Sequence, residues 1–99
     1  MEYRVEITDT ALAEVEEAYL WIRERSPSQA TKWRKELLET AKSLQTNPER
    51  CPLAPENHEF ISYELRHILH GNYRVVYSIV NDIVCILHIR HSAQRLVTP

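Results

Sequence analysis

The chain has 99 residues, of which 43% are hydrophobic and 26% charged, and its formal net charge is −2. This size and balance predict one soluble globular domain, residues 1–99, with a core that needs no disulfide or metal to hold it. They exclude a membrane protein, because no apolar run approaches the roughly 20 residues that cross a bilayer.

The first elements predicted are a strand and a helix. Residues 3–7 alternate between apolar and polar side chains, as a strand with one buried face does. Thr8, Asp9 and Thr10 are candidate N-caps for the helix that follows. Its apolar stripe is expected to contain Leu12, Val15, Ala18, Tyr19 and Ile22, with Leu20 and Trp21 off the stripe and Glu14, Glu16 and Glu17 on the water-facing side.

A second helix is predicted directly after the first. Ser26 and Gln29 form a capping box, and Pro27 suits the first helical position. One face then carries Ala30, Trp33, Leu37, Ala41 and Leu44. Because so short a junction joins them, the two helices should form an antiparallel hairpin. Prolines 48, 52 and 55 then predict a stiff connecting loop over residues 47–57.

Residues 63–91 predict three strands joined by two tight turns, at Gly71-Asn72 and Asn81-Asp82. Gly, Asn and Asp tolerate the positive φ angles that two-residue hairpin loops require. The whole order is therefore an N-terminal strand, a helical hairpin and a three-stranded antiparallel meander. We expect an α+β fold in which the helices pack on one face of the sheet.

Counting outward from the two turns predicts the strand register. Ile68 should oppose Val75 and Arg66 should oppose Tyr77 in the first hairpin. In the second, Tyr77 should oppose Ile86 and Val75 should oppose His88. Because side chains alternate between faces, this register places Arg66, Tyr77, His88 and Arg90 on one face and His67, Arg74 and His91 on the other.

Charge divides the chain into an acidic and a basic part. Residues 65–99 contain Asp82 as their one acidic residue, against Arg66, Arg74, Arg90 and Arg95. An anionic target is therefore favoured on this side, with Arg66, Arg74, Tyr77, His88, Arg90 and Arg95 as candidate contact residues. Three interpretations stay open for this set. The first is RNA cleavage, in which Arg stabilises phosphate charge and His or Tyr moves protons. The others are binding of an anionic partner without chemistry, and a purely structural role.

Cofactor and metal sites are not predicted. The chain has a single glycine and hence no glycine-rich phosphate loop. Its histidines do not combine with cysteines or acids into a zinc-ligand pattern. Cys51 and Cys85 form no CxxC pair, so we expect free thiols and a reducing, cytoplasmic location.

The chain resembles the RelE/ParE superfamily of toxins from bacterial type II toxin–antitoxin systems. The resemblance runs from Tyr3 to Arg95. It is carried by YRVEITDTALAEV, WIRERSP, LQTNPERCP, YRVVY and the closing ILHIRHSAQR. It implies a growth-inhibiting toxin, of the kind linked to plasmid stabilisation, that a cognate antitoxin neutralises by wrapping around it.

The superfamily contains two activity classes. The ending IRHSAQR is closer to the ParE-like branch, whose members inhibit DNA gyrase and use no nuclease residues. The alternative is a RelE-like, ribosome-dependent mRNA endonuclease, for which Arg66, Arg74 and His91 are the candidate catalytic residues. Glu64, where some nucleases have lysine, and the acidic net charge argue against tight ribosome docking.

A third possibility is a non-toxic relic that still binds its antitoxin. Antitoxin contact is expected on the helical hairpin and on exposed sheet edges, because an edge strand offers unpaired backbone groups to another chain.

Overall fold

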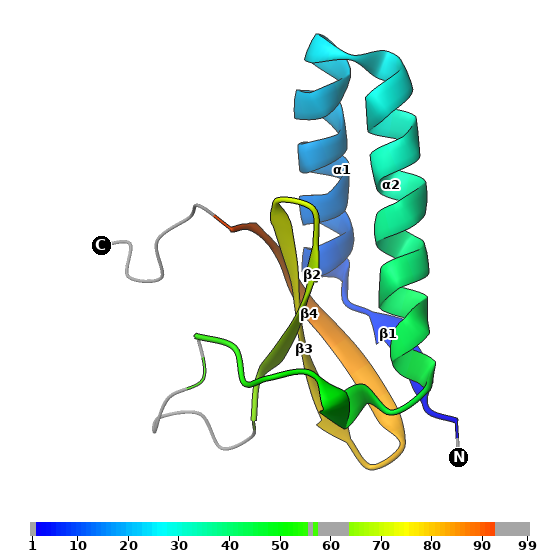
Figure 1. The fold of residues 1–99 in the computed structure, drawn as a ribbon, viewed down its shortest axis with the longest axis vertical. Coiled ribbons are helices and arrows are strands. Elements are labelled where there is room, and N and C mark those ends of the chain that lie inside the picture. Colours follow the sequence, from blue (N-terminus) through cyan, green and yellow to red (C-terminus); the bar gives the residue numbers. More distant parts are fainter. Residues whose placement is uncertain (1, 56, 58–63, 93–99) are drawn as a thin grey trace.

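The computed structural model describes residues 2–55, 57 and 64–92, and it has two layers: a helical hairpin and a four-stranded sheet (Figure 1). The predicted α+β fold is confirmed, with the helices on one side of the sheet. In chain order the elements are β1 (Arg4–Ile7), α1 (Asp9–Arg25), α2 (Pro27–Lys42), β2 (Arg66–His70), β3 (Tyr73–Val80) and β4 (Ile83–His91), with short 3-10 turns at Ser43–Gln45 and Pro48–Arg50.

Both helices begin at the caps that the sequence predicts. The Thr8 hydroxyl accepts the Ala11 N–H at 3.2 Å, and the Ser26 hydroxyl accepts the Gln29 N–H at 3.4 Å. Each cap satisfies one of the N–H groups that the first turn of a helix leaves without a partner. Ser26 also ends α1, because its own N–H donates to the Ile22 carbonyl. One residue thus closes the first helix and opens the second, and the two run antiparallel as predicted (Figure 1).

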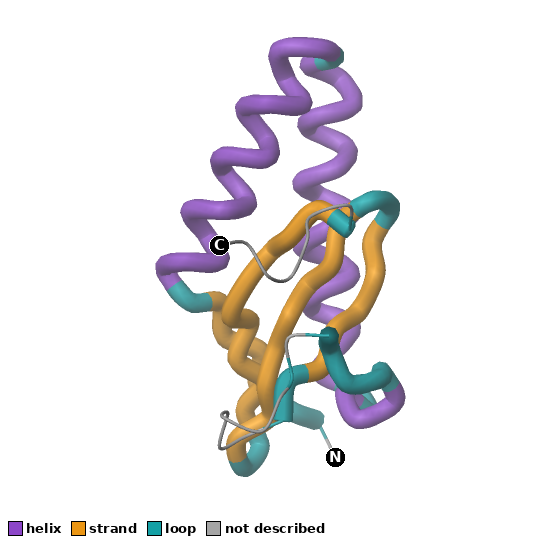
Figure 2. The backbone as a smooth tube through the Cα atoms, turned by 90° about the vertical axis from the view of Figure 1, so that its left-hand side faces the viewer, coloured by secondary structure: helices purple, strands orange, loops and turns teal. Residues whose placement is uncertain are grey.

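The strand order in the sheet is β1-β4-β3-β2, and Figure 2 shows the strands lying side by side in one sheet. The last three strands form the predicted antiparallel meander, while β1 lies parallel to β4 at the far edge. The turn residues Gly71 and Asn81 both have φ near +57°, a left-handed conformation that suits glycine and asparagine. Both predicted turns are therefore confirmed.

The core lies between the hairpin and the facing side of the sheet. From α2 it receives Leu37 and Ala41, as predicted. From α1 it receives Ala11 and Val15, whereas Leu12 is 48% exposed, so its predicted place in the stripe is wrong. Ala11 and Val15 form an equally regular i, i+4 pattern, and the small alanine lets the helix approach the sheet closely. Leu20 and Trp21 lie off the buried stripe, as expected.

The register is confirmed in the first hairpin and only partly in the second. Ile68 opposes Val75, and Tyr77 opposes Ile86, as counted. Beyond Tyr77 the pairing shifts by one residue, so Val75 opposes Ile89, and the predicted Val75–His88 pair is wrong. A β-bulge inserts one extra residue into β4 at this point. The shift turns Ile89, only 7% exposed, into the core, where an isoleucine is more stable than a histidine.

Candidate functional site

Arg66 and Tyr77 lie opposite one another in the sheet, as predicted, and both hold the proline-rich loop. The Arg66 guanidinium donates to the Cys51 carbonyl at 2.6 Å and to the Glu49 carbonyl at 3.4 Å. It also forms an ion pair with Glu64 at 3.2 Å. These contacts use the arginine's rigid set of donors to fasten the loop to β2, which gives Arg66 a structural role.

Tyr77 completes this fastening from β3. Its side chain is fully buried, and its hydroxyl donates to the Pro48 carbonyl at 2.6 Å. Burial, followed by the adjacent Cys51 thiol, raises the pKa of the Tyr77 phenol well above its ordinary value. The hydroxyl therefore stays protonated and remains a donor throughout the working pH range. The side chain was predicted to contact a target, but in this structure it lies entirely inside the protein and holds the loop.

Arg74 and Arg90 form the second grouping, on what we call the outer face, the side of the sheet turned away from the helices. They oppose one another directly on β3 and β4, so they share a face, contrary to the prediction. Arg74 is only 6% exposed, and its Nη1 lies 3.2 Å from His67 Nδ1. Because an arginine can only donate, His67 Nδ1 is the acceptor in this contact. Val76, which neighbours these residues, packs on Ala54 and Leu65 of the same face.

His91 lies on the other side of the sheet, toward the helices. It opposes Tyr73, and the two rings meet edge to face with centroids 5.0 Å apart. The Tyr73 ring in turn lies 5.0 Å from that of Trp33 on α2. Burial raises the pKa of the Tyr73 phenol. His91 is thus one end of an aromatic stack that joins α2 to the end of β4.

His88 lies at the bulge, opposite Val76 on β3. Its Nδ1 is 3.4 Å from the Glu14 carboxylate, which also accepts the Ile89 N–H at 2.9 Å. Glu14, expected on the water-facing side of its helix, is therefore half-buried against β4. No signal in the sequence identified this role. Arg95, the last predicted contact residue, lies outside the described residues.

The candidate residues are consequently divided among three places. Arg66 and Tyr77 hold the loop, Arg74 and Arg90 lie on the outer face, and His91 lies beside the helices. The one-face cluster of Arg66, Tyr77, His88 and Arg90 is not observed. Among the predicted contact residues that the structure describes, Arg74 and Arg90 are paired on the outer face, and Arg66 and Tyr77 are paired beneath the loop.

The two sheet edges differ in how far the chain itself covers them. At β2, the loop forms a bridge between Leu53 and Arg66, and the His67 N–H donates to the Pro52 carbonyl. At β1, the Arg4 and Thr8 N–H groups donate inward to β4, so by alternation the backbone groups of Val5 and Ile7 point outward. Beside that edge lies a mainly apolar hollow of about 280 Å³, lined by Val5, Ile7, Leu38, Ala41, Lys42 and Gln45.

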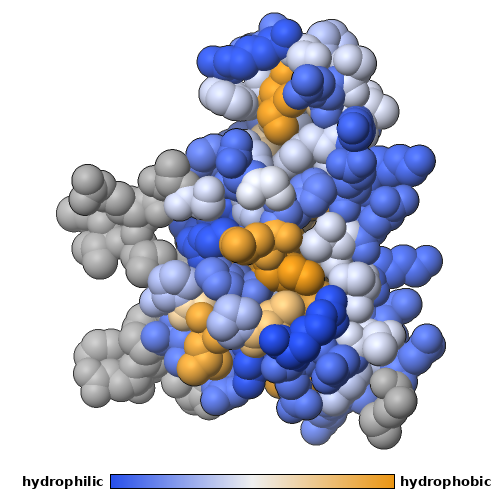
Figure 3. All heavy atoms as spheres, viewed as in Figure 1, coloured by the Kyte–Doolittle hydropathy of each residue, from blue (hydrophilic) through white to orange (hydrophobic). Residues whose placement is uncertain are grey.

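Exposed apolar side chains are scattered over the rest of the surface. Figure 3 shows small, separate hydrophobic patches among hydrophilic atoms, one over the sheet and one on the helical hairpin. The exposed set includes Leu12, Leu20, Trp21 and Leu38 on the hairpin, Leu53 in the loop, and Leu69 and Val80 on the strands. Arg25 stacks on the exposed Trp21 ring at 3.8 Å, which partly shields it.

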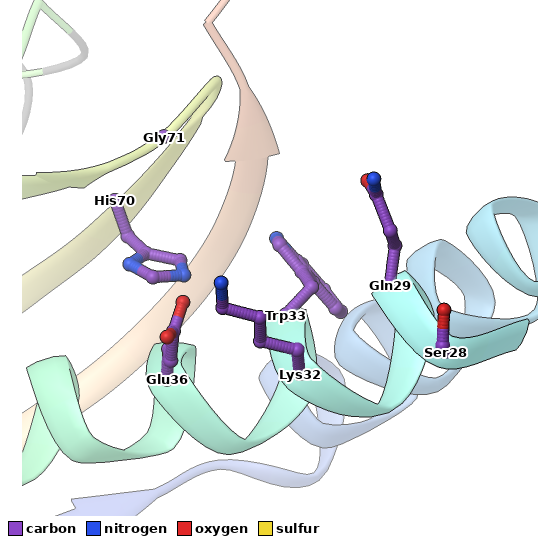
Figure 4. Close-up of a pocket in the computed structure, with 7 residues that line it drawn as sticks. All are labelled: Ser28, Gln29, Lys32, Trp33, Glu36, His70 and Gly71. Carbon is purple, nitrogen blue, oxygen red and sulfur yellow. The ribbon is translucent and has the colours of Figure 1, made fainter. Parts of the chain in front are cut away.

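A further hollow, of about 580 Å³, lies between α2 and the turn that joins β2 to β3 (Figure 4). Lys32, Trp33 and Glu36 reach into it from the helix, and His70 faces them from the strand. The opposite charges of Lys32 and Glu36 give the hollow no single sign. It contains none of the predicted contact residues.

Metal and membrane sites were searched over the same described ranges. Within them, no three His, Cys, Asp or Glu side chains converge as metal ligands. None of the helices there combines the length and the apolar character that crossing a bilayer requires.

Comparison with known proteins gives one family and several related folds. The family model described as "ParE toxin of type II toxin-antitoxin system, parDE" matches residues 5–96. A chain of the chromosomal ParDE toxin–antitoxin system from P. aeruginosa is similar in structure, with a TM-score of 0.75, 17% identity, and coverage of 91% of this chain and 96% of that one.

Two RelE-type structures have a similar fold as well. A chain of the archaeal RelE–RelB complex from Pyrococcus horikoshii matches with a TM-score of 0.60, 20% identity, and coverage of 96% of this chain and all of the other. A chain of the RelBE2 toxin–antitoxin complex from Mycobacterium tuberculosis matches with a TM-score of 0.60, 23% identity, and coverage of 92% and 99%. A search of curated protein sequences finds no significant match.

Proposed function

The chain belongs to the ParE family of toxins of type II toxin–antitoxin systems, and we propose that it arrests growth by inhibiting DNA gyrase until a cognate antitoxin neutralises it. Gyrase binding would use the outer face of the sheet, with the half-buried Arg90 as the central contact and the buried Arg74 beside it adding positive charge. The antitoxin would bind the β1 edge and the helical hairpin. The toxin would act in the cytoplasm, where both partners are made.

The direct pairing of Arg74 with Arg90 is the observation that carries this proposal. Two arginines side by side on neighbouring strands concentrate positive charge on one face, which favours an acidic protein surface. Of the three arginines described between residues 65 and 92, these two share the outer face. Target recognition by this pair needs no proton transfer.

The same arrangement disfavours the endonuclease alternative. A nuclease would need Arg66, Arg74 and His91 around one phosphate, whereas Arg66 holds the loop and His91 stacks on Tyr73. Arg74 lies across the sheet from both. A formal net charge of −2 also provides little of the cationic surface on which ribosomal RNA binding depends.

Antitoxin binding is proposed at β1 because the two sheet edges differ in how many of their backbone groups are already paired. The outward backbone groups of Val5 and Ile7 are available to an added strand, and the adjacent hollow would take one of its apolar side chains. The first residues of β2, in contrast, already pair with the loop. Similarity to toxin chains solved with their antitoxins supports a partner of this kind.

A supercoiling assay with purified gyrase tests the proposal. We expect the wild-type toxin to inhibit supercoiling, and Arg90→Ala to weaken inhibition roughly tenfold or more, the loss typical of one charged contact. Arg25→Ala is the matched control, because it removes the same charge from the far end of α1. Both variants should keep the circular dichroism spectrum and the Tm of the wild type, which shows that they are folded.

Three outcomes would contradict the proposal. The first is unchanged supercoiling at saturating toxin. The second is transcript cleavage that disappears with Arg74→Ala and His91→Ala, which would establish the endonuclease instead. The third is harmless expression of the toxin alone, which would identify a relic.

A further inference from the structure

The β-bulge in β4 decides which side of the sheet Arg90 occupies. Tyr77 opposes Ile86 but its neighbour Val76 opposes His88, so Leu87 is the additional residue. A regular strand would instead place Arg90 opposite Tyr73, on the helix side, and Ile89 opposite Arg74, on the outer face. The bulge exchanges these two positions, burying Ile89 and bringing Arg90 beside Arg74.

The bulge occurs where β4 loses its neighbouring strand. β1 pairs with β4 up to Ile7 and Ile86, and the Thr8 N–H donates to the Ile86 carbonyl. After Thr8 the chain turns into α1, so no strand is available to accept the next outward N–H of β4. In a regular strand, the next outward N–H after Ile86 would be that of His88, two residues later. The extra residue of the bulge makes it the N–H of Ile89 instead.

Glu14 of α1 supplies the missing acceptor. Its Oε1 accepts the Ile89 N–H at 2.9 Å, and its carboxylate lies 3.4 Å from His88 Nδ1. One carboxylate therefore contacts both the backbone of Ile89 and the side chain of His88. The Ile89 contact is specific to the bulged register, because in a regular strand the outward N–H would be that of His88.

Resting on the role proposed above for Arg90, we propose that Glu14 is a positioning residue for target binding: it holds the bulge and so keeps Arg90 beside Arg74. Glu14 itself need not contact the target. Its carboxylate acts through the backbone N–H of Ile89, the residue before the arginine that it positions.

The direct test is solution NMR on Glu14→Ala. We expect exchange of the Ile89 amide to accelerate roughly tenfold to a hundredfold, as for the loss of one hydrogen bond to a charged group. The cross-strand contacts between the backbones of Arg74 and Arg90 should weaken as well. Glu14→Gln keeps an oxygen acceptor and should behave like the wild type. Glu17→Ala, one helical turn further along α1, is the control for loss of an acidic side chain.

A deletion separates positioning from a general structural effect. Removing His88 leaves Leu87 opposite Val76 and keeps Arg90 opposite Arg74 in a regular strand without a bulge. In this shortened chain, adding Glu14→Ala should leave the Arg74–Arg90 contacts unchanged. If Glu14→Ala does not fold in the full chain, Glu14→Asp replaces it, since the shorter side chain keeps the charge and withdraws the carboxylate from Ile89.

Two results would overturn the inference. One is a full-length Glu14→Ala variant whose Ile89 amide and Arg74–Arg90 contacts match the wild type. The other is loss of those contacts in the His88-deleted chain as well. Gyrase inhibition, measured in parallel, tests the proposed function separately. If Glu14→Ala loses the Arg74–Arg90 backbone contacts but inhibits gyrase as strongly as the wild type, Glu14 positions Arg90 and Arg90 does not bind the target.

Discussion

Replacing Tyr77 by phenylalanine should destabilise the protein without weakening target binding. The substitution removes one hydroxyl and leaves the Pro48 carbonyl, which it meets at 2.6 Å, without that donor in a fully buried position. A buried polar group left unsatisfied costs about 1–3 kcal/mol. For a domain of this size each kcal/mol corresponds to roughly 4–8 °C in Tm, so a cost near 2 kcal/mol predicts a decrease of about 8–16 °C.

Thermal unfolding followed by circular dichroism measures this effect, and Tyr73→Phe is the matched control. Tyr73 lies on the same strand and the same face, and its hydroxyl donates to no described residue. Its loss should therefore change Tm by less than about 3 °C. A Tyr77→Phe variant with wild-type Tm would refute the fastening role. Weaker gyrase inhibition at unchanged Tm would instead restore Tyr77 as a contact residue.

Two further predictions concern antitoxin binding and helix capping. Val5→Pro removes an outward N–H from β1 and should weaken antitoxin binding roughly tenfold, as measured by titration calorimetry. Leu69→Pro, on the opposite edge of the sheet, should leave the binding affinity unchanged. The reverse result would place the added strand at β2. Ser26→Ala removes the cap of α2 and should lower stability in urea by about 1 kcal/mol. Ser28→Ala, inside the same turn, should cost less than half as much, and equal losses would argue against capping.

Local signals in the sequence were sufficient for the elements and their order. Caps, proline positions and turn residues act within a few neighbours along the chain, so both helices and both hairpin turns could be predicted from residues such as Ser26 and Gly71. The apolar stripe of α1 was harder to predict. The predicted and observed stripes share Val15 and Ala18 and differ in the first turn, where the choice between Leu12 and Ala11 depends on how closely the helix approaches the sheet.

The candidate site shows the limit of local reasoning more sharply. Arg66 and Arg74 are both strand arginines, and alternation correctly separates their faces. Alternation does not reveal that a distant loop lies over Arg66, which receives the carbonyls of Glu49 and Cys51. A residue that satisfies loop carbonyls and one that binds a partner look alike in sequence, because the difference lies in what the chain brings beside them.

Chain order, helix ends, hairpin turns and the basic character of the last third could all be read from residue types and their spacing, because each depends on chemistry within one or two turns of backbone. The face on which Arg90 lies could not. It depends on one extra residue in β4, stabilised by burial of Ile89 and by a hydrogen bond from its backbone to Glu14, 75 positions away. Contacts over such separations exist only once the helices have packed on the sheet, and here they determine which surface a partner meets.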